Sequence, residues 1–360
     1  MKYIDEFKDR NLCLALVKKM DFLLGDSEVS IMEVCGTHTM AIFRSGLRSL
    51  LPPPINLLSG PGCPVCVTPT SYLDKAIALS AKEEVIIATF GDMMRVPGSG
   101  SSLERQKAAG GEIYVVYSPL EALDIAENNR DKKVVFLAIG FETTSPTLAV
   151  TAIEAKKRGI SNFYLLSGNK RIPPALESLA RDGDLKVDGF ILPGHVSTII
   201  GVKPYLFLAE KYGLPSVICG FEPLDILQGI CMILRQLKEG RADVEIQYSR
   251  VVKNDGNAEA MALLHRVFVE TDSEWRGLGP IAESGYNLRK EYEELDANQV
   301  FSLMEMASVE MDGCICGEIL KGLKIPNQCP HFGKSCIPSS PVGACMVSSE
   351  GTCAAYYKYG

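Results

Sequence analysis

The sequence lacks the features that mark most nucleic-acid-binding and membrane proteins. It has 37 lysine and arginine residues against 44 aspartate and glutamate residues, a formal net charge of −7, and no basic tract. We therefore expect no nucleic-acid partner. No apolar run reaches the roughly 18 residues that a membrane-spanning helix needs, so we expect no membrane segment. Residues 1–10 are charged and hold no apolar stretch, so we expect no signal peptide and a cytoplasmic protein.

Phosphate-binding motifs are missing as well. The chain has no Gly-x4-Gly-Lys-Ser/Thr loop, and Gly98-Ser99-Gly100 lacks the rest of the dinucleotide fingerprint. The motifs therefore give no support for nucleotide binding. With 360 residues, 46% of them apolar and 22% charged, the composition is that of a soluble globular protein of two or three domains.

Short apolar runs alternate with helical patterns up to about residue 225, which predicts βαβ units and parallel sheets. The runs form two series that resemble each other, since Leu57-Leu58-Ser59-Gly60 recurs as Leu165-Leu166-Ser167-Gly168. We predict an α/β fold with two similar parallel-sheet domains, 26–118 and 119–225. A third, mixed α+β domain is expected from residues 1–25 and 226–360. The predicted strands are Val29–Val34, Ile55–Leu58, Val85–Phe90, Ile113–Tyr117, Val134–Ile139, Phe163–Leu166, Gly189–Leu192 and Ser216–Cys219.

Twelve cysteines are many for a chain in a reducing compartment, where they indicate metal or redox chemistry. Cys13, Cys219 and Cys231 stand alone in apolar patterns and are predicted to be small buried hydrophobes. Cys63 and Cys66 flank two residues in a Gly- and Pro-rich loop after a predicted strand, where open α/β sheets bind ligands.

The Cys63/Cys66 pair has three interpretations. It can be a dithiol/disulfide couple, half of a metal site, or two unreactive thiols. A thioredoxin-like site would put the first cysteine at a helix N-terminus. Here the prolines predict that the helix begins only at Thr70, after the pair. The loop is expected to be exposed, which favours reactive thiols.

Polar residues end several other predicted strands. Cys35 and His38 lie three residues apart, so they can bind iron together, or His38 can activate Cys35 as a nucleophile; a buried cysteine with a capping histidine is the plain alternative. Candidate cleft residues after later strands are Glu142, Thr143, Thr144, His195 and Ser197. Turn formation and helix capping explain the hydroxyl residues equally well.

The C-terminal tail holds six cysteines. Cys314, Cys329, Cys336 and Cys353 are separated by 14, 6 and 16 residues, and four thiolates can bind either zinc or a [4Fe–4S] cluster. The tail has no pair of C-x2-C knuckles typical of zinc ribbons, and its Gly- and Pro-rich spacers favour a cluster. Disulfides remain the alternative, made less favourable by the expected compartment.

Together these motifs resemble the HypD family, iron–sulfur proteins that help mature [NiFe]-hydrogenases. The resemblance extends from residue 35 to the C-terminus, and the motifs that carry it are Cys35–His38, Gly60–Cys66, Gly140–Thr144, Pro193–Ser197 and Met346–Tyr357. It implies three domains, the third carrying a [4Fe–4S] cluster on Cys314, Cys329, Cys336 and Cys353.

The resemblance also implies a function. The chain would be a scaffold that assembles an Fe(CN)2CO unit with a HypC-type chaperone. Cyanide would come from a thiocyanate on HypE, and the finished unit would pass to the hydrogenase large subunit. Iron would be held transiently by Cys35, with His38 close by, and the Cys63/Cys66 dithiol would supply electrons drawn from the cluster. Glu142, Thr143, Thr144 and His195 would line the cleft and donate hydrogen bonds or protons.

A monomer that binds its partners transiently is expected. Two other classes of protein fit the residues. One is a stand-alone iron–sulfur thiol–disulfide oxidoreductase that needs no partner proteins. The other is a structural adaptor whose cluster only keeps the tail folded.

Overall fold

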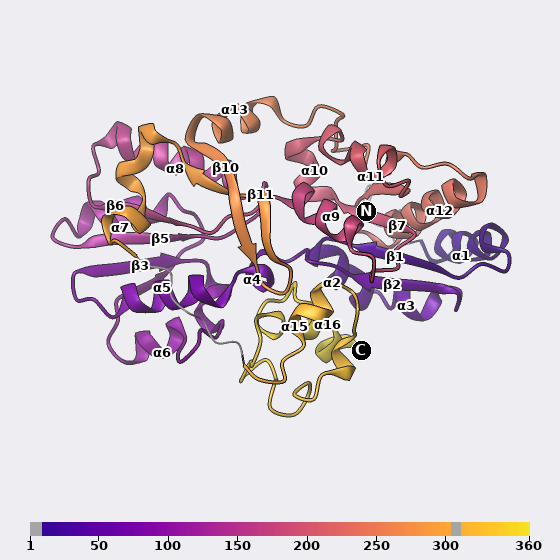
Figure 1. Ribbon diagram of the computed structural model, residues 1–360, viewed down its shortest axis with the longest axis horizontal. Helices are drawn as coiled ribbons and strands as arrows, with labels where there is room; N and C mark the ends of the chain where they lie inside the picture. The colour runs from indigo at the N-terminus through magenta and orange to yellow at the C-terminus, as the bar shows by residue number, and fades with distance from the viewer. Residues whose placement is uncertain (1–8, 304–310) are drawn as a thin grey trace.

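Two parallel sheets form the two halves of the molecule (Figure 1). The computed structural model describes residues 9–303 and 311–360. The first sheet has the order β2-β1-β7-β8-β9, with β2 (Ile55–Ser59), β1 (Val29–Glu33), β7 (Gly189–Pro193), β8 (Ser216–Cys219) and β9 (Val244–Ile246). The second has the order β4-β3-β5-β6, with β4 (Ile113–Val115), β3 (Val85–Thr89), β5 (Lys133–Ala138) and β6 (Phe163–Ser167). Every predicted run forms a strand, and the α/β class with parallel pairing is confirmed.

The strands read as continuous apolar runs because both faces of each sheet are covered. In β1, Ile31 packs into one core while its neighbour Met32 packs into another on the opposite face. The outer face of the first sheet is covered by α1 (Arg10–Leu24), α2 (Gly36–Arg44), α3 (Leu47–Leu50) and α12 (Pro223–Glu239). The outer face of the second is covered by α7 (Glu121–Asn128), α8 (Ser145–Arg158) and α13 (Ala258–Val267).

A central core joins the two inner faces. It receives side chains from both sheets, from the C-terminal tail and from an antiparallel hairpin, β10 (Phe268–Trp275) and β11 (Gly279–Leu288). In Figure 1 this hairpin lies between the two halves and points toward the tail. The helices that line the core include α5 (Thr70–Ser80), α6 (Leu103–Ala108), α9 (Ile172–Arg181), α10 (Gly194–Ile200), α11 (Leu206–Glu210), α15 (Cys316–Leu320) and the 3-10 helix η6 (Ala344–Met346).

The sheets do not follow the domain boundaries expected at residues 118 and 225. β1 and β2, expected to share a domain with β3 and β4, pair with each other and with β7 instead. The chain leaves the first sheet after β2, builds the second, and returns at β7 to complete the first. Helix α1 and strand β9, assigned to a third domain, also belong to the first sheet's half. The expected division is corrected accordingly.

Two smaller expectations concern the rest of the chain. Cys13, Cys219 and Cys231 are buried among apolar side chains of the first sheet's outer core, as predicted. Within the described ranges, no helix has the length and apolar character needed to cross a bilayer. The β10–β11 hairpin was not predicted, because its strands are half exposed and carry several acidic residues in place of an apolar run.

Candidate functional site: a chain of buried thiols

Cys35 lies two residues after β1, at the N-cap position of α2, and its side chain makes no capping hydrogen bond. The loop after β2 packs directly on it: the Gly36 amide donates to the Gly62 carbonyl (2.9 Å), and a Cβ at Gly62 would be 2.4 Å from the Cys35 Cα. No side chain fits between the two loops. Because Cys63 follows Gly62, the turn that carries Cys35 lies directly against the loop that carries the predicted dithiol. Burial raises the pKa of Cys35 to about 12.

A buried carboxyl group fixes the turn at Cys35. Glu33 is 1% exposed, and its Oε2 accepts the Cys35 amide hydrogen (3.2 Å) while its Oε1 accepts the Thr39 hydroxyl hydrogen (2.6 Å). Burial raises the pKa of Glu33 to about 7. This residue was missed by the sequence analysis. An acidic residue at the end of an apolar strand, two positions before Cys35, was the available signal.

His38 is fully buried, and one aromatic side chain, Phe221, contacts both its ring and that of His195. Its Nε2 is 3.0 Å from the Gly220 carbonyl oxygen, so Nε2 carries the hydrogen. Among the described residues, Nδ1 has no hydrogen-bond partner. Burial lowers the pKa of His38 to about 4, which leaves the ring neutral with a free lone pair on Nδ1. Phe221 contacts the His38 ring and stacks on the exposed His195 ring, with centroid distances of 4.7 and 4.0 Å.

The Cys63/Cys66 pair differs from expectation in two ways. A short helix, α4 (Pro64–Val67), begins directly after Cys63, and the Cys66 amide donates to the Cys63 sulfur (3.2 Å). The first cysteine therefore does cap a helix, because proline fits the first turn. Both thiols are also buried, at 3% and 0% exposure, although the loop was expected to be exposed. The tail covers them, with the Ala344 carbonyl 4.0 Å from the Cys66 sulfur.

The tail cysteines line one cavity, and Gly343 leaves room for the Cys314 sulfur, which would lie 3.0 Å from an added Cβ. In the described parts of the chain, no three Cys, His, Asp or Glu side chains are close enough to hold a single metal ion. Zinc needs four donors about 2.1–2.3 Å from one ion, whereas a cubane binds each thiolate through a different iron. The cavity is lined by Cys314, Cys316, Cys329, Cys336, Cys345 and Cys353, with His331 beside them.

Cys316 and Cys345 connect this cavity to the Cys63/Cys66 pair. Their sulfurs are 2.9 Å apart. The Cys66 thiol interacts with Cys345 on one side and Cys63 on the other, and burial is the main reason that its pKa is raised. The sequence analysis assigned these two cysteines no role, because nothing in the spacing of the tail separates them from the other four.

The remaining predicted residues divide into buried and exposed groups. Glu142 is 1% exposed; its Oε1 accepts the Ile172 amide hydrogen (3.0 Å), and burial raises its pKa to about 7. Thr143 is exposed, and Thr144 occupies the N-cap position of α8 without a side-chain capping hydrogen bond; both lie in the turn before that helix. The pKa of Tyr205 is raised mainly by burial and further by the charges of Glu142 and Cys35, which places both groups near one phenol.

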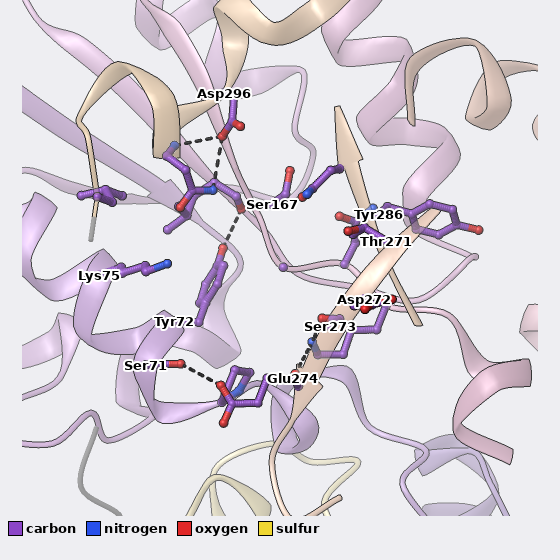
Figure 2. A pocket seen from close by; sticks show the side chains of 18 residues that line it. Ser71, Tyr72, Lys75, Ser167, Thr271, Asp272, Ser273, Glu274, Tyr286 and Asp296 are labelled. Carbon is purple, nitrogen blue, oxygen red and sulfur yellow. Dashed lines mark hydrogen bonds between the residues drawn. The ribbon is translucent and has the colours of Figure 1, made fainter. Parts of the chain in front are cut away.

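A separate cavity of about 540 Å³ lies between helix α5, the end of β6 and the β10–β11 hairpin (Figure 2). Tyr72, Lys75, Ser167 and Asp296 line it, and it contains no cysteine. Lys170 also lines this cavity. Its buried ammonium group donates to the Ser273 hydroxyl and to the Glu274 carbonyl, both at 2.7 Å. This cavity is therefore distinct from the thiol chain, and Lys170 anchors the hairpin beside it.

The contact at Gly62 predicts a strong effect of a single methyl group. Gly62→Ala would place a Cβ 2.3 Å from the Cys35 nitrogen, so the two loops must separate. We expect a loss of about 1–3 kcal/mol of unfolding free energy, measured from the midpoint of urea unfolding. Gly100→Ala is the control, because nothing lies within 4 Å of its Cβ position. Equal midpoints for the two variants would contradict the contact.

The buried Glu142 predicts a pH dependence of stability. Its pKa of about 7 in the folded protein exceeds the ordinary value of 4.5, so its stabilising contribution is present below pH 4.5 and is lost as the pH rises through 7. Glu142→Gln removes that loss. Relative to the natural protein, the variant should gain about 3 kcal/mol between pH 4.5 and pH 8. Urea unfolding at both pH values measures it, with exposed Glu291→Gln as the control; a constant difference would disprove the shift.

Comparison with known proteins gives a consistent result. A family model named HypD and described as "Hydrogenase formation hypA family" matches residues 11–360. The hydrogenase maturation factor HypD of Rhodobacter capsulatus is 46% identical over 371 aligned positions, covering 100% of this chain and 98% of the relative. The hydrogenase expression/formation protein HupD of Azotobacter chroococcum mcd 1 is 47% identical, covering 100% and 97%. HypD of Escherichia coli K12 is 43% identical, covering 100% and 98%. The chain that carries this thiol site belongs to the HypD family of hydrogenase maturation factors.

Proposed function

We propose that the protein is the scaffold on which the Fe(CN)2CO unit of a [NiFe]-hydrogenase is built. The observation that carries the proposal is a series of thiol contacts from Cys63, through Cys66 and Cys345, to Cys316 at the tail cavity, beside the turn that carries Cys35. Iron is the cargo. The Cys35 thiolate binds it, since soft thiolate suits iron that carries cyanide and carbonyl. His38, whose Nδ1 has a free lone pair, lies three residues after Cys35 on α2.

The Cys63/Cys66 dithiol supplies the electrons for cyanide release. HypE delivers cyanide as a thiocyanate, R–S–CN. Two cysteine thiols reduce it to R–SH and HCN and close to a disulfide, so both electrons and both protons come from the pair. The HypC-type chaperone supplies a further thiolate to the iron and carries the finished unit to the hydrogenase large subunit. The Glu142 carboxyl, whose pKa is about 7, accepts or returns protons near the cargo.

The tail restores the dithiol. Cys345 attacks the Cys63–Cys66 disulfide at the Cys66 sulfur, and Cys316 then displaces Cys66 from the mixed disulfide. The exchange regenerates Cys63 and Cys66 as thiols and leaves Cys316 and Cys345 joined, so the number of electrons is conserved. We assign Cys314, Cys329, Cys336 and Cys353 as ligands of a [4Fe–4S] cluster, which supplies single electrons when bound.

The burial of Cys63 and Cys66 favours a scaffold over a stand-alone oxidoreductase. An enzyme that reduces disulfides in other proteins needs a thiol accessible to its substrate. Here the exposed fractions are 3% and 0%, and the tail covers the pair. A thiocyanate on the C-terminal cysteine of HypE is carried by a chain end, which can enter a closed site more readily than a disulfide inside a folded protein can.

The iron position is tested by infrared spectroscopy on protein isolated anaerobically with its HypC-type partner. Cyanide and carbonyl bound to iron absorb where protein is nearly silent. We expect these bands in the natural protein and none in Cys35→Ala. Cys63→Ala should retain iron but show no cyanide band, because the dithiol is lost. Cys13→Ala, a buried cysteine outside the site, is the control. Normal cyanide loading in Cys63→Ala would exclude the redox role.

The relay is tested by alkylation and mass spectrometry. The cluster-loaded protein is oxidised with diamide and then treated with dithionite, and thiols are labelled. The natural protein should recover Cys63 and Cys66 as thiols, whereas Cys345→Ala should keep them as a disulfide at least tenfold longer. Cys231→Ala is the matched control, because its sulfur lies beside the Leu16 carbonyl in the outer core. Equal recovery in Cys345→Ala would show that electrons bypass this pair.

A further inference from the structure

The orientation of the His38 ring depends on one backbone carbonyl. Gly220 follows β8, and its carbonyl oxygen accepts the Nε2 hydrogen of the buried His38 ring (3.0 Å). In a neutral ring the other nitrogen, Nδ1, then keeps a lone pair. Histidines that bind metals commonly donate their second ring nitrogen to a carbonyl or carboxylate, which fixes the tautomer and the plane of the ring. Whatever holds the Gly220 carbonyl therefore decides which nitrogen His38 offers.

A buried carboxylate holds this carbonyl from both sides. Gln247, directly after β9, accepts the Gly220 amide hydrogen with its Oε1 (3.0 Å) and donates from its Nε2 to Asp225 Oδ1 (2.8 Å). Two residues along the chain, the Glu222 amide donates to Asp225 Oδ2 (3.3 Å). The amides before and after the Gly220 carbonyl are thus both tied to Asp225, one through Gln247 and one directly.

Packing holds the same loop in place. A Cβ at Gly220 would lie 2.3 Å from Asp225 Oδ2, so only glycine allows the loop to approach the carboxylate this closely. The next residue, Phe221, has its ring 4.7 Å from the His38 ring and meets Tyr248 edge-on at 5.8 Å. The loop therefore touches His38 with a carbonyl and an aromatic ring, and Asp225 anchors the segment that carries both.

Helix capping explains only part of what Asp225 does. It lies in the first turn of α12, and its bond to the Glu222 amide is half of a capping box. Asp225 is nevertheless 0% exposed and accepts further hydrogen bonds from Gln247 and from both terminal nitrogens of Arg250 (2.8 and 2.5 Å). A buried carboxylate is stable when its charge is paired and its oxygens are hydrogen-bonded. Arg250 supplies the paired charge, which leaves the carboxylate free to fix the loop.

We propose that Asp225 is a positioning residue for the iron site: it fixes the Gly220 carbonyl, which holds His38 in the tautomer that keeps Nδ1 available to the iron cargo. The inference rests on the proposed function, because it gives His38 a role toward iron bound at Cys35. Among the described residues, Nδ1 has no hydrogen-bond partner although the ring is fully buried. A buried polar atom left without a partner costs free energy, and a metal that enters the site would remove that cost.

The first test measures the His38 ring in the full-length protein without cargo. Proton–nitrogen NMR distinguishes the two neutral tautomers, and with four histidines in the chain His38→Gln assigns the signal. We expect the natural protein to carry the hydrogen on Nε2. Gln247→Met removes the acceptor of the Gly220 amide, so solvent exchange of that hydrogen should be at least tenfold faster. Gln236→Met is the matched control, because Gln236 Oε1 likewise accepts a backbone amide hydrogen, from Asp243 (2.7 Å), near the other end of α12.

The second test measures the cargo on protein isolated anaerobically with its HypC-type partner. The infrared bands of iron-bound cyanide and carbonyl, normalised to folded protein, should fall at least fivefold in Gln247→Met and stay at the natural level in Gln236→Met. Arg250→Met loosens the network from its outer end, where the side chain is 38% exposed, and should speed the His38 exchange at least threefold. This variant decides the question if Gln247→Met does not fold.

The outcomes separate this inference from the proposed function. Unchanged exchange of the His38 hydrogen in Gln247→Met, or in Arg250→Met where only that variant folds, would overturn the positioning role. Faster exchange with full cargo bands would overturn it too, while leaving the proposed function intact. Natural protein without the bands would overturn the proposed function and this inference with it. Equal changes in Gln236→Met would assign the effect to a general loosening of α12 and contradict the proposal.

Discussion

The site depends on one contact between backbones, where the loop after β2 packs on the turn after β1 without an intervening side chain. The two strands are adjacent and parallel, in register from Val29 opposite Ile55 to Glu33 opposite Ser59, so both chains leave the sheet at the same edge. Gly62 then lies on Cys35, and Cys63 follows at once. A side chain at this position would separate the Cys35 turn from the loop that carries Cys63. The buried Glu33 carboxyl holds the same turn from inside the sheet.

The C-terminal tail closes the site and joins the halves of the molecule. The Thr37 hydroxyl, in the first sheet's half, donates to Glu350 (2.7 Å), and the Ser348 hydroxyl donates to Asp92 (2.8 Å) in the second sheet's half. Residues two positions apart in the tail therefore contact both halves. Between them the tail covers Cys66 and brings Cys345 to it. The segment that carries the cysteine cavity is also the segment that excludes solvent from the dithiol.

The sequence predicted the strands well, because parallel strands covered on both faces leave apolar runs that local pattern detects. It also identified the cysteines and polar residues at the strand ends. It did not predict which strands share a sheet, since β1 pairs with β7 through contacts such as Ile31 with Gly189, far apart in the chain. For the same reason it expected an exposed Cys63 loop: the tail that covers the loop folds over it from the other end of the chain.

The roles of Cys316 and Cys345 show the same limit more sharply. The spacing of the six tail cysteines does not distinguish them, and only the fold shows that Cys345 reaches Cys66 while its sulfur lies 2.9 Å from that of Cys316. Spacing cannot supply that distinction, because it depends on how the loops fold back.

Burial has a consequence for how such thiols react. A thiolate is the attacking form in disulfide exchange, yet burial raises the pKa of Cys66 and of Cys35, so the thiols stay protonated and inert toward solvent oxidants. Exchange then depends on geometry, which brings each sulfur to its next partner, and on charge supplied by the surrounding protein. The hairpin tip contributes to this geometry at the junction between the pairs, because its backbone contacts both α4 and α15. Burial therefore closes these thiols to the solvent, while contacts made by the tail bring Cys345 to Cys66.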